Sequence, residues 1–230
     1  MSNDMLRHLS GGNGGGHRPY RDDAANGMYN LLFCDEPARF APKGDAPQGV
    51  LATVLAEPAD RVALEGIAND QGMESRIRML AFNRLRAMKV EVPSKQLLGV
   101  ILEVPLGQGL DTLAVFADGR MRYINQAEKI GIFEDVPPAI AQKAQLVLRA
   151  SQAVVDQIGP ATEPRRAPPT GDLTRMTFLV SDGLYFGEAA TDDMYADALG
   201  GPVMGNAAEL LHLLVEHTLQ RQGEPSGKSN

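Results

Sequence analysis

Two short stretches decide the fold of this 230-residue chain: LAVFADGRMRY at residues 113–123 and TFLVSDGLYF at residues 177–186. In each stretch an Asp-Gly pair separates two apolar segments. This pattern is typical of a two-residue β-hairpin turn, because the turn needs positive φ angles. The spacing predicts that Phe116 pairs with Met121 in the first hairpin and Val180 with Tyr185 in the second. Both faces of the second hairpin are apolar, so we expect it to be the more central one.

Further strands and helices follow from the hydrophobic pattern outside the hairpins. Residues 97–104 are almost continuously apolar and stop at Pro105, which favours a central strand. The run 29–34 suits a buried strand at the start of the core, and 130–133 suits a short additional one. Helices are predicted over 73–88, from Pro58 to Gly66 or Asn69, from Pro137 to 158, and from Pro202 onward. No state is assigned to residues 35–57.

The predicted order is strand, helix, strand, hairpin, helix, hairpin, helix. It indicates an α+β fold: a mostly antiparallel sheet, built from the two Asp-Gly hairpins and central strands, with helices packed against it. From the helix at residue 73 onward, the order resembles that of roadblock and profilin-like sheet folds. That resemblance lies in the topology alone, and it implies a platform for interactions.

Composition divides the chain into a core and two tails. The glycine-rich residues 11–16 and their polar neighbours predict a disordered tail over 1–27, and residues 222–230 are read in the same way. The core, 28–221, is interpreted as a single domain. Its proline-rich stretch 159–172 is read as a long loop in preference to a linker between domains.

Charge and cysteine content narrow the cellular setting. Cys34 is the only cysteine, so an intrachain disulfide is excluded and a reducing, cytoplasmic location is expected. No signal-like or membrane-spanning segment of about 20 apolar residues is found. The net charge of −7 disfavours binding to nucleic acids and anionic membranes by long-range attraction.

No local motif points to a cofactor or a metal. His212 and His217 lie five positions apart, which places them on different faces of a helix. The acidic segment 192–197 is read as a solvated loop or helix start. Cys34 lacks a nearby histidine or a nucleophile signature and is read as a buried structural cysteine. We therefore expect no cofactor, no metal and no catalytic residue that the sequence can identify.

The predicted helix 73–88 carries the candidate binding residues. Opposite its apolar stripe lie a phenylalanine and three cations, namely Arg78, Phe82, Arg86 and Lys89. These residues could form an exposed interaction patch, or Phe82 could pack into a second layer of the same domain. Arg84 falls inside the apolar arc, so its guanidinium must either extend to solvent or meet a carboxylate partner, and an internal pair is favoured over an anion-binding role.

Three functions compete on this evidence. The first is a non-catalytic interaction or adaptor protein that binds a protein partner or a second copy of itself. The second is an enzyme whose site is assembled only by folding. The third is an RNA-binding module that uses the helix patch with Arg120 and Arg122, which the hairpin pattern places together on one face of the first hairpin. The sequence favours the first.

Overall fold

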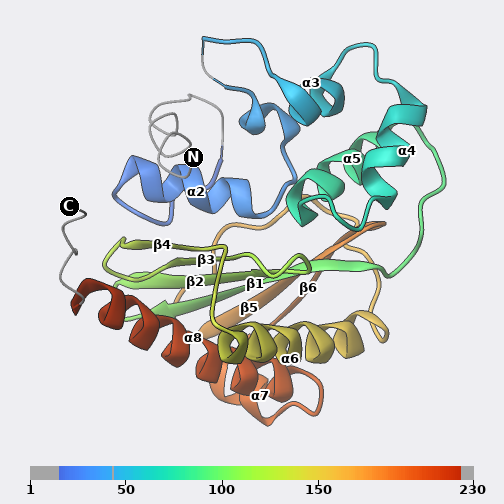
Figure 1. The fold of residues 1–230 in the computed structure, drawn as a ribbon. Coiled ribbons are helices and arrows are strands. Elements are labelled where there is room, and N and C mark those ends of the chain that lie inside the picture. The colour runs from blue at the N-terminus through green and yellow to red at the C-terminus, as the bar shows by residue number, and fades with distance from the viewer. Residues whose placement is uncertain (1–15, 43, 224–230) are drawn as a thin grey trace, which may run out of the picture.

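The computed structural model of the protein describes residues 16–42 and 44–223 (Figure 1). The expected tails at residues 1–15 and 224–230 lie outside this range. Residues 16–27 were also expected in a tail, but they belong to the folded part. Tyr20 is only 6% exposed, and its hydroxyl lies 2.8 Å from the Thr112 hydroxyl. The boundary predicted at residue 28 is therefore too late.

A six-stranded antiparallel sheet forms the centre of the α+β fold, as the sequence predicted. The strand order is β4-β3-β2-β1-β5-β6. The strands are β1 (Leu97–Leu106), β2 (Gly109–Phe116), β3 (Met121–Ile124), β4 (Ile130–Phe133), β5 (Leu173–Val180) and β6 (Gly183–Ala190). The sheet therefore ends in β4 on one side and β6 on the other.

The first hairpin is shifted by one residue from its predicted register. Val115, and not Phe116, pairs with Met121, because the loop has three residues and ends in Gly119 at φ +86°. A three-residue loop with glycine in the left-handed region is the next common hairpin type. A one-residue slip turns each side chain to the other face. As a result Arg122 lies on the same face as Ala114 and Phe116, and it is 3% exposed.

The second hairpin is shifted by two residues, which leaves the faces as predicted. Val180 pairs with Gly183 and Phe178 with Tyr185. Its expected central position is wrong, because β6 is an edge strand. The central strand β1 runs past Pro105, whose missing N–H is tolerated because the pairing with β5 ends at Glu103.

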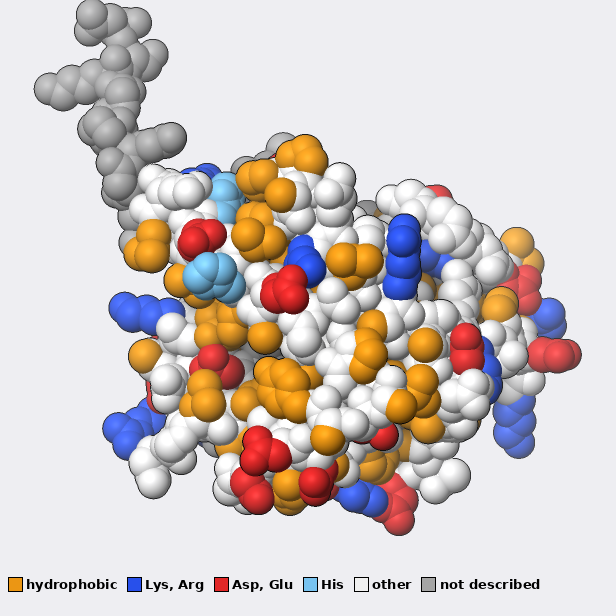
Figure 2. All heavy atoms as spheres, turned by 90° about the horizontal axis from the view of Figure 1, so that it is seen from below, with side chains coloured by type: hydrophobic (Ala, Val, Ile, Leu, Met, Phe, Trp, Pro, Cys, Tyr) orange, Lys and Arg blue, Asp and Glu red, His pale blue; other side chains and the backbone are white. Residues whose placement is uncertain are grey.

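Helices cover both faces of the sheet (Figure 1). One layer contains α2 (Asp23–Leu32), η1 (Pro37–Phe40), α3 (Gly49–Leu55), α4 (Arg61–Asn69) and α5 (Ser75–Ala87). The other contains α6 (Pro138–Val155), α7 (Thr191–Ala196) and α8 (Gly200–Gly223). Figure 2 views this second layer from below and shows apolar side chains dispersed among charged ones. The segment 159–170 is a loop, as expected.

Helix α2 replaces the strand predicted at residues 29–34. The Asp22 carboxylate accepts a hydrogen bond from the Ala25 N–H and caps the helix, while Ala25, Met28, Tyr29 and Leu32 recur at helical spacing and are buried. The helix ends before Cys34, which has φ +54°. The apolar run is therefore the last turn of an amphipathic helix.

Two apolar cores lie on the two faces of the sheet. Beneath α2 to α5 the core includes Tyr29, Phe33, Phe82 and Phe116. Beneath α6 to α8 it is built from the alternate side chains of the same strands and from the buried faces of these helices. The α2 face also carries buried polar groups, and the candidate site lies there.

Candidate functional site

A row of polar side chains crosses the sheet on the α2 face. The pairing register aligns Thr112 of β2, Glu103 of β1, Arg175 of β5 and Glu188 of β6 side by side. Thr112, Glu103 and Arg175 are each at most 5% exposed. Polar groups without water need hydrogen-bond partners inside the protein. The row therefore positions the segments that pack on this part of the sheet.

Glu103 is the innermost charged residue of the row. Its Oε1 accepts a hydrogen bond of 2.6 Å from the hydroxyl of Tyr29, and its Oε2 has no partner among the described residues. Burial raises the pKa of the Glu103 carboxyl, although the Tyr29 hydrogen bond and the charge of Arg175 oppose the shift. Burial, followed by the neighbouring Glu103, likewise raises the pKa of Tyr29. Glu103 is 0% exposed, so its role is internal.

Arg175 ties the sheet to the loop 159–172. Its Nε and Nη2 bind Glu188 Oε2 at 2.8 and 2.5 Å, and its Nη1 donates to the Ala167 carbonyl at 2.7 Å. The guanidinium thus neutralises an edge-strand carboxylate and fixes the loop by its backbone. A fork of this kind is suited to planar, multiple hydrogen bonding.

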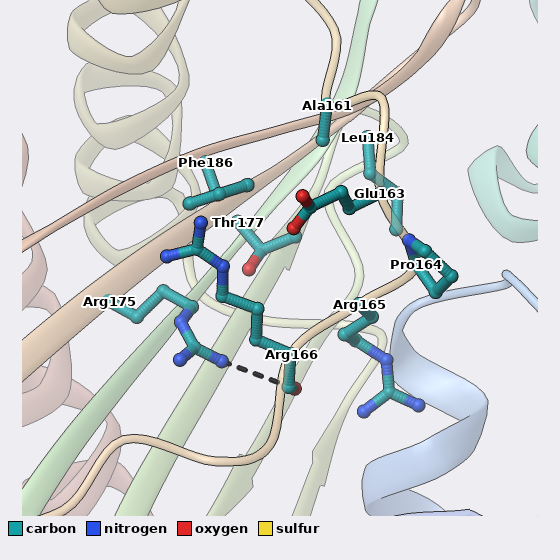
Figure 3. A pocket seen from close by; sticks show the side chains of 9 residues that line it. All are labelled: Ala161, Glu163, Pro164, Arg165, Arg166, Arg175, Thr177, Leu184 and Phe186. Atoms are coloured by element: carbon teal, nitrogen blue, oxygen red, sulfur yellow. Dashed lines mark hydrogen bonds between the residues drawn. The ribbon is translucent and has the colours of Figure 1, made fainter.

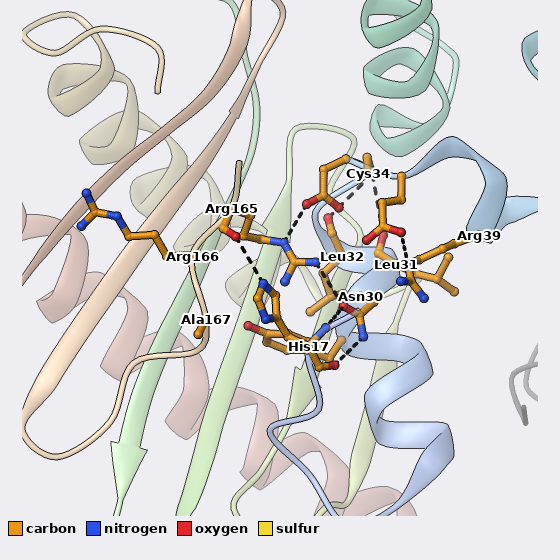
Figure 4. A network of polar contacts seen from close by, with 12 residues as sticks. His17, Asn30, Leu31, Leu32, Cys34, Arg39, Arg165, Arg166 and Ala167 are labelled. Carbon is orange, nitrogen blue, oxygen red and sulfur yellow. Dashed lines mark hydrogen bonds and ion pairs between the residues drawn. The ribbon is translucent and has the colours of Figure 1, made fainter. Parts of the chain in front are cut away.

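Arg165 ties the same loop to α2 (Figure 4). Its Nε binds Asp35 Oδ2 at 2.7 Å, its Nη2 donates to Asn30 Oδ1 at 3.1 Å, and its guanidinium lies 4.0 Å from the centroid of the Phe33 ring. The Arg165 carbonyl lies 3.2 Å from His17 Nε2. The side chain of Arg165 is 5% exposed. The Nε and Nη2 groups of Arg165 are therefore occupied by contacts within the chain, whereas its buried Nη1 has no hydrogen-bond partner among the described residues.

Between these two anchors lies a small pocket that is open to solvent. The loop contributes one wall, and β5 and β6 contribute the floor (Figure 3). Its lining residues are Ala161, Glu163, Pro164, Arg165, Arg166, Arg175, Thr177, Leu184 and Phe186. The β6 part of the floor is apolar, with Leu184 and Phe186, whereas β5 contributes Arg175 and the loop contributes two arginines and Glu163.

Arg166 differs from the other two arginines of the pocket. It is exposed, and its guanidinium lies 4.7 Å from the centroid of the Phe186 ring. Within residues 16–42 and 44–223, no carboxylate lies within ion-pair distance of it. Its neighbours Arg165 and Arg175 hold the loop that presents it. A positioned, unpaired guanidinium is suited to bind a carboxylate or a phosphate.

The patch predicted on helix α5 is not an exposed surface. Phe82 is 1% and Arg78 3% exposed, so the alternative that Phe82 packs into a second layer is the one found. Arg78 donates to the Ala68 carbonyl, and Arg86 donates to the Ser181 carbonyl at the β5–β6 turn. Lys89 is exposed beyond the end of the helix.

Arg84 has the carboxylate partner that its place in the apolar arc required. Its Nη1 lies 2.6 Å from Glu57 Oε1, and its Nη2 donates to the Ala56 carbonyl at 2.9 Å. The Glu57 side chain is 72% exposed, so the pair lies at the surface. The hydrogen bond from Arg84 lowers the pKa of Glu57.

The remaining sequence candidates are not brought together. Arg122 is buried and binds Glu134 Oε1 at 2.9 Å, and Arg120 pairs with Asp118, so neither joins a surface with Phe82. Cys34 is 0% exposed, as predicted, and burial raises the pKa of its thiol. It lies in the core beneath α2, whereas the helix that carries His212 and His217 packs on the opposite face of the sheet.

Sequence reasoning missed the three pocket arginines. The available signal was the pair Arg165-Arg166 inside a proline-rich stretch. The partners of Arg165 lie 130 and 135 positions away, which no local pattern reveals.

Comparison with known proteins identifies no relative: no family model, curated protein or solved structure matches this chain. Among the residues that the structure describes, no group of three or more His, Cys, Asp or Glu side chains is placed to hold a metal ion. The helices of this part of the chain are also too short or too polar to cross a membrane.

Proposed function

We propose that this chain is a non-catalytic interaction protein that acts in the cytoplasm and binds a partner protein at the pocket of Arg166 and Phe186. The partner supplies a carboxylate or another anionic group to Arg166. The observation that carries the proposal is the exposed guanidinium of Arg166, which lies over Phe186 without a carboxylate partner in the described part of the chain.

The chemistry of the pocket supports binding over catalysis. An arginine stays protonated at every physiological pH and cannot act as a general acid or base. Arg165 and Arg175 are held in ion pairs with Asp35 and Glu188. Glu103, a carboxyl with a raised pKa near the pocket, is sealed beneath the sheet's covering layer and cannot reach a substrate from its present position. Arginine beside an aromatic ring is also enriched at protein interfaces.

The test is affinity capture from a cell lysate with three forms of the full chain: wild type, Arg166→Glu and Arg149→Glu. Arg149 is an exposed arginine on α6, in the layer on the other face of the sheet, so it matches the charge change away from the pocket. A partner held by the wild type and by Arg149→Glu, but lost by Arg166→Glu, is the expected result. Equal capture by all three forms would show that the partner does not bind at the pocket.

A further inference from the structure

Strand β6 is the edge of the sheet, and its backbone carries groups that point away from the protein. The Ala161 N–H donates to the Leu184 carbonyl at 2.7 Å. Ala161 is not part of β5, so the Leu184 carbonyl points away from β5. Successive residues of a strand alternate in direction. The N–H and C=O groups of Phe186 and Glu188 therefore point outward as well.

These outward groups have no covering segment in the part of the chain that the structure describes. Ala161 pairs with the beginning of β6, and the loop then turns over the face of the sheet toward α2 (Figure 3). An uncovered edge strand is a template for another strand, and natural proteins use such edges to bind extended peptides. Ala161 already occupies the first position on this edge.

The open edge and the arginine pocket are one continuous surface. The side chains of Leu184, Phe186 and Glu188 share the face of the sheet that bears the pocket, because they alternate with Tyr185, which is buried in the other core. A strand added next to β6 would place alternate side chains beside Phe186 and Arg166. An acidic side chain at that position would pair with the free guanidinium.

The charged residues along the edge determine where an acidic side chain of the partner can bind. Glu188 is already neutralised by Arg175. Glu163 lines the pocket, is exposed and disfavours a second carboxylate close to it. Arg166 over Phe186 is the favourable position between them.

We infer that the partner of the proposed pocket is an extended protein segment that adds to β6 as a further strand and places an Asp or Glu side chain on Arg166. This inference rests on the proposed function. It goes further, because it requires main-chain hydrogen bonds to β6 in addition to a bound anion.

The test uses a synthetic probe, acetyl-Thr-Val-Thr-Glu-Thr-Val-Thr-amide, titrated into the full chain by calorimetry. Two further probes carry N-methyl groups on alternate amides, one set at the odd positions and the other at the even ones. Strand addition places one set against β6 and the other in solvent. One methylated probe should therefore lose binding, and the other should bind as the parent does. Equal behaviour of the two methylated probes overturns strand addition.

Variants of the edge give an independent readout. Phe186→Pro removes the outward N–H, which an edge strand tolerates, and Phe186→Thr removes the same ring but keeps the N–H. We expect Phe186→Pro to bind the probe about tenfold more weakly than Phe186→Thr. Equal affinity of the two variants contradicts the inference. Circular dichroism of both variants checks that the sheet is intact, and the methylated probes decide the question if either variant fails to fold.

The failure of this inference is distinguishable from failure of the proposed function. If the capture of a partner depends on Arg166 but neither methylated probe loses binding, the anionic pocket stands and strand addition is wrong. If no ligand responds to Arg166→Glu, both are wrong. If sedimentation shows a dimer of the chain that Phe186→Pro dissociates, the occupant of the edge is a second copy, and the inferred partner is wrong.

Discussion

Arg165 and Arg166 are adjacent arginines with different roles, and replacing each by alanine separates these roles. Arg165 forms an ion pair with Asp35 in which the two side chains are 5% and 21% exposed. Removal of one partner from a buried pair costs about 3 to 5 kcal/mol. Because Asp35 keeps some access to water, we expect Arg165→Ala to cost about 3 kcal/mol, at the lower end of that range.

Arg166 contributes much less to stability. Its contact within the described chain is the exposed stacking on Phe186, and such contacts contribute about 0.5 to 1 kcal/mol. Arg166→Ala should therefore lower the free energy of unfolding by less than about 1 kcal/mol.

Urea unfolding followed by far-ultraviolet circular dichroism measures both variants. With a slope of about 2 kcal/mol per molar urea, the midpoint should fall by about 1.5 M for Arg165→Ala and by less than about 0.5 M for Arg166→Ala. Adding Asp35→Ala to the Arg165→Ala variant should cause little further loss of unfolding free energy, because the two residues are coupled. Equal losses in the two single variants would refute the assignment of Arg165 as the anchor of the loop.

Three further predictions concern the layer of α2 to α5 and the core beneath it. Phe82→Ala should lower the free energy of unfolding by about 3 to 5 kcal/mol in the same urea assay, because the ring is 1% exposed. A loss below about 1 kcal/mol would show that the ring is not buried. Because the pKa of Glu103 is raised in the folded state, its contribution to stability is complete below about pH 4 and is lost as pH rises through the folded pKa. Glu103→Gln should flatten this part of the stability curve measured across pH 4 to 8, and an unchanged slope would contradict the raised pKa. Cys34 should react with a thiol reagent only after urea unfolds the protein, and rapid labelling of the native chain would show that its burial is wrong.

Periodicity predicted most of the sheet and the longer helices, because those elements are defined by local patterns. The strand β1 and the helices α5 and α6 follow from continuous or 3.6-residue apolar spacing within their own sequences. The failure at residues 29–34 has a specific cause. The cap of α2, Asp22, lies within the stretch whose glycine-rich composition predicts a tail, and the last turn of a helix without a visible start resembles a buried strand.

The hairpin registers show a second limit of local reasoning. An Asp-Gly pair indicates that a hairpin is present, but the loop length depends on how the flanking side chains pack. In the first hairpin Phe116 packs beneath the α5 layer, and the loop has three residues in place of the expected two. The slip places Arg122 on the same face as Ala114 and Phe116, where it is buried and not available at the surface for RNA.

The candidate site could not be predicted in the same way, because it is made by residues far apart in sequence. Arg175 meets the loop through the Ala167 carbonyl, and Arg165 meets α2 through Asp35. Only the folded sheet brings Arg166 over Phe186. The residues chosen on α5 were a cationic and aromatic cluster in sequence, but the helix is covered on both sides, which a single helical projection does not reveal.

The affinity of the glutamate probe for the wild type, Arg166→Gln and Arg149→Gln forms of the chain tests the central claim most directly. Arg166→Gln should bind about tenfold more weakly, in line with the loss of a charge-assisted hydrogen bond, and Arg149→Gln should bind as the wild type does. If Arg166→Gln binds the probe as tightly as the wild type, the pocket does not recognise an anionic partner and the account is wrong.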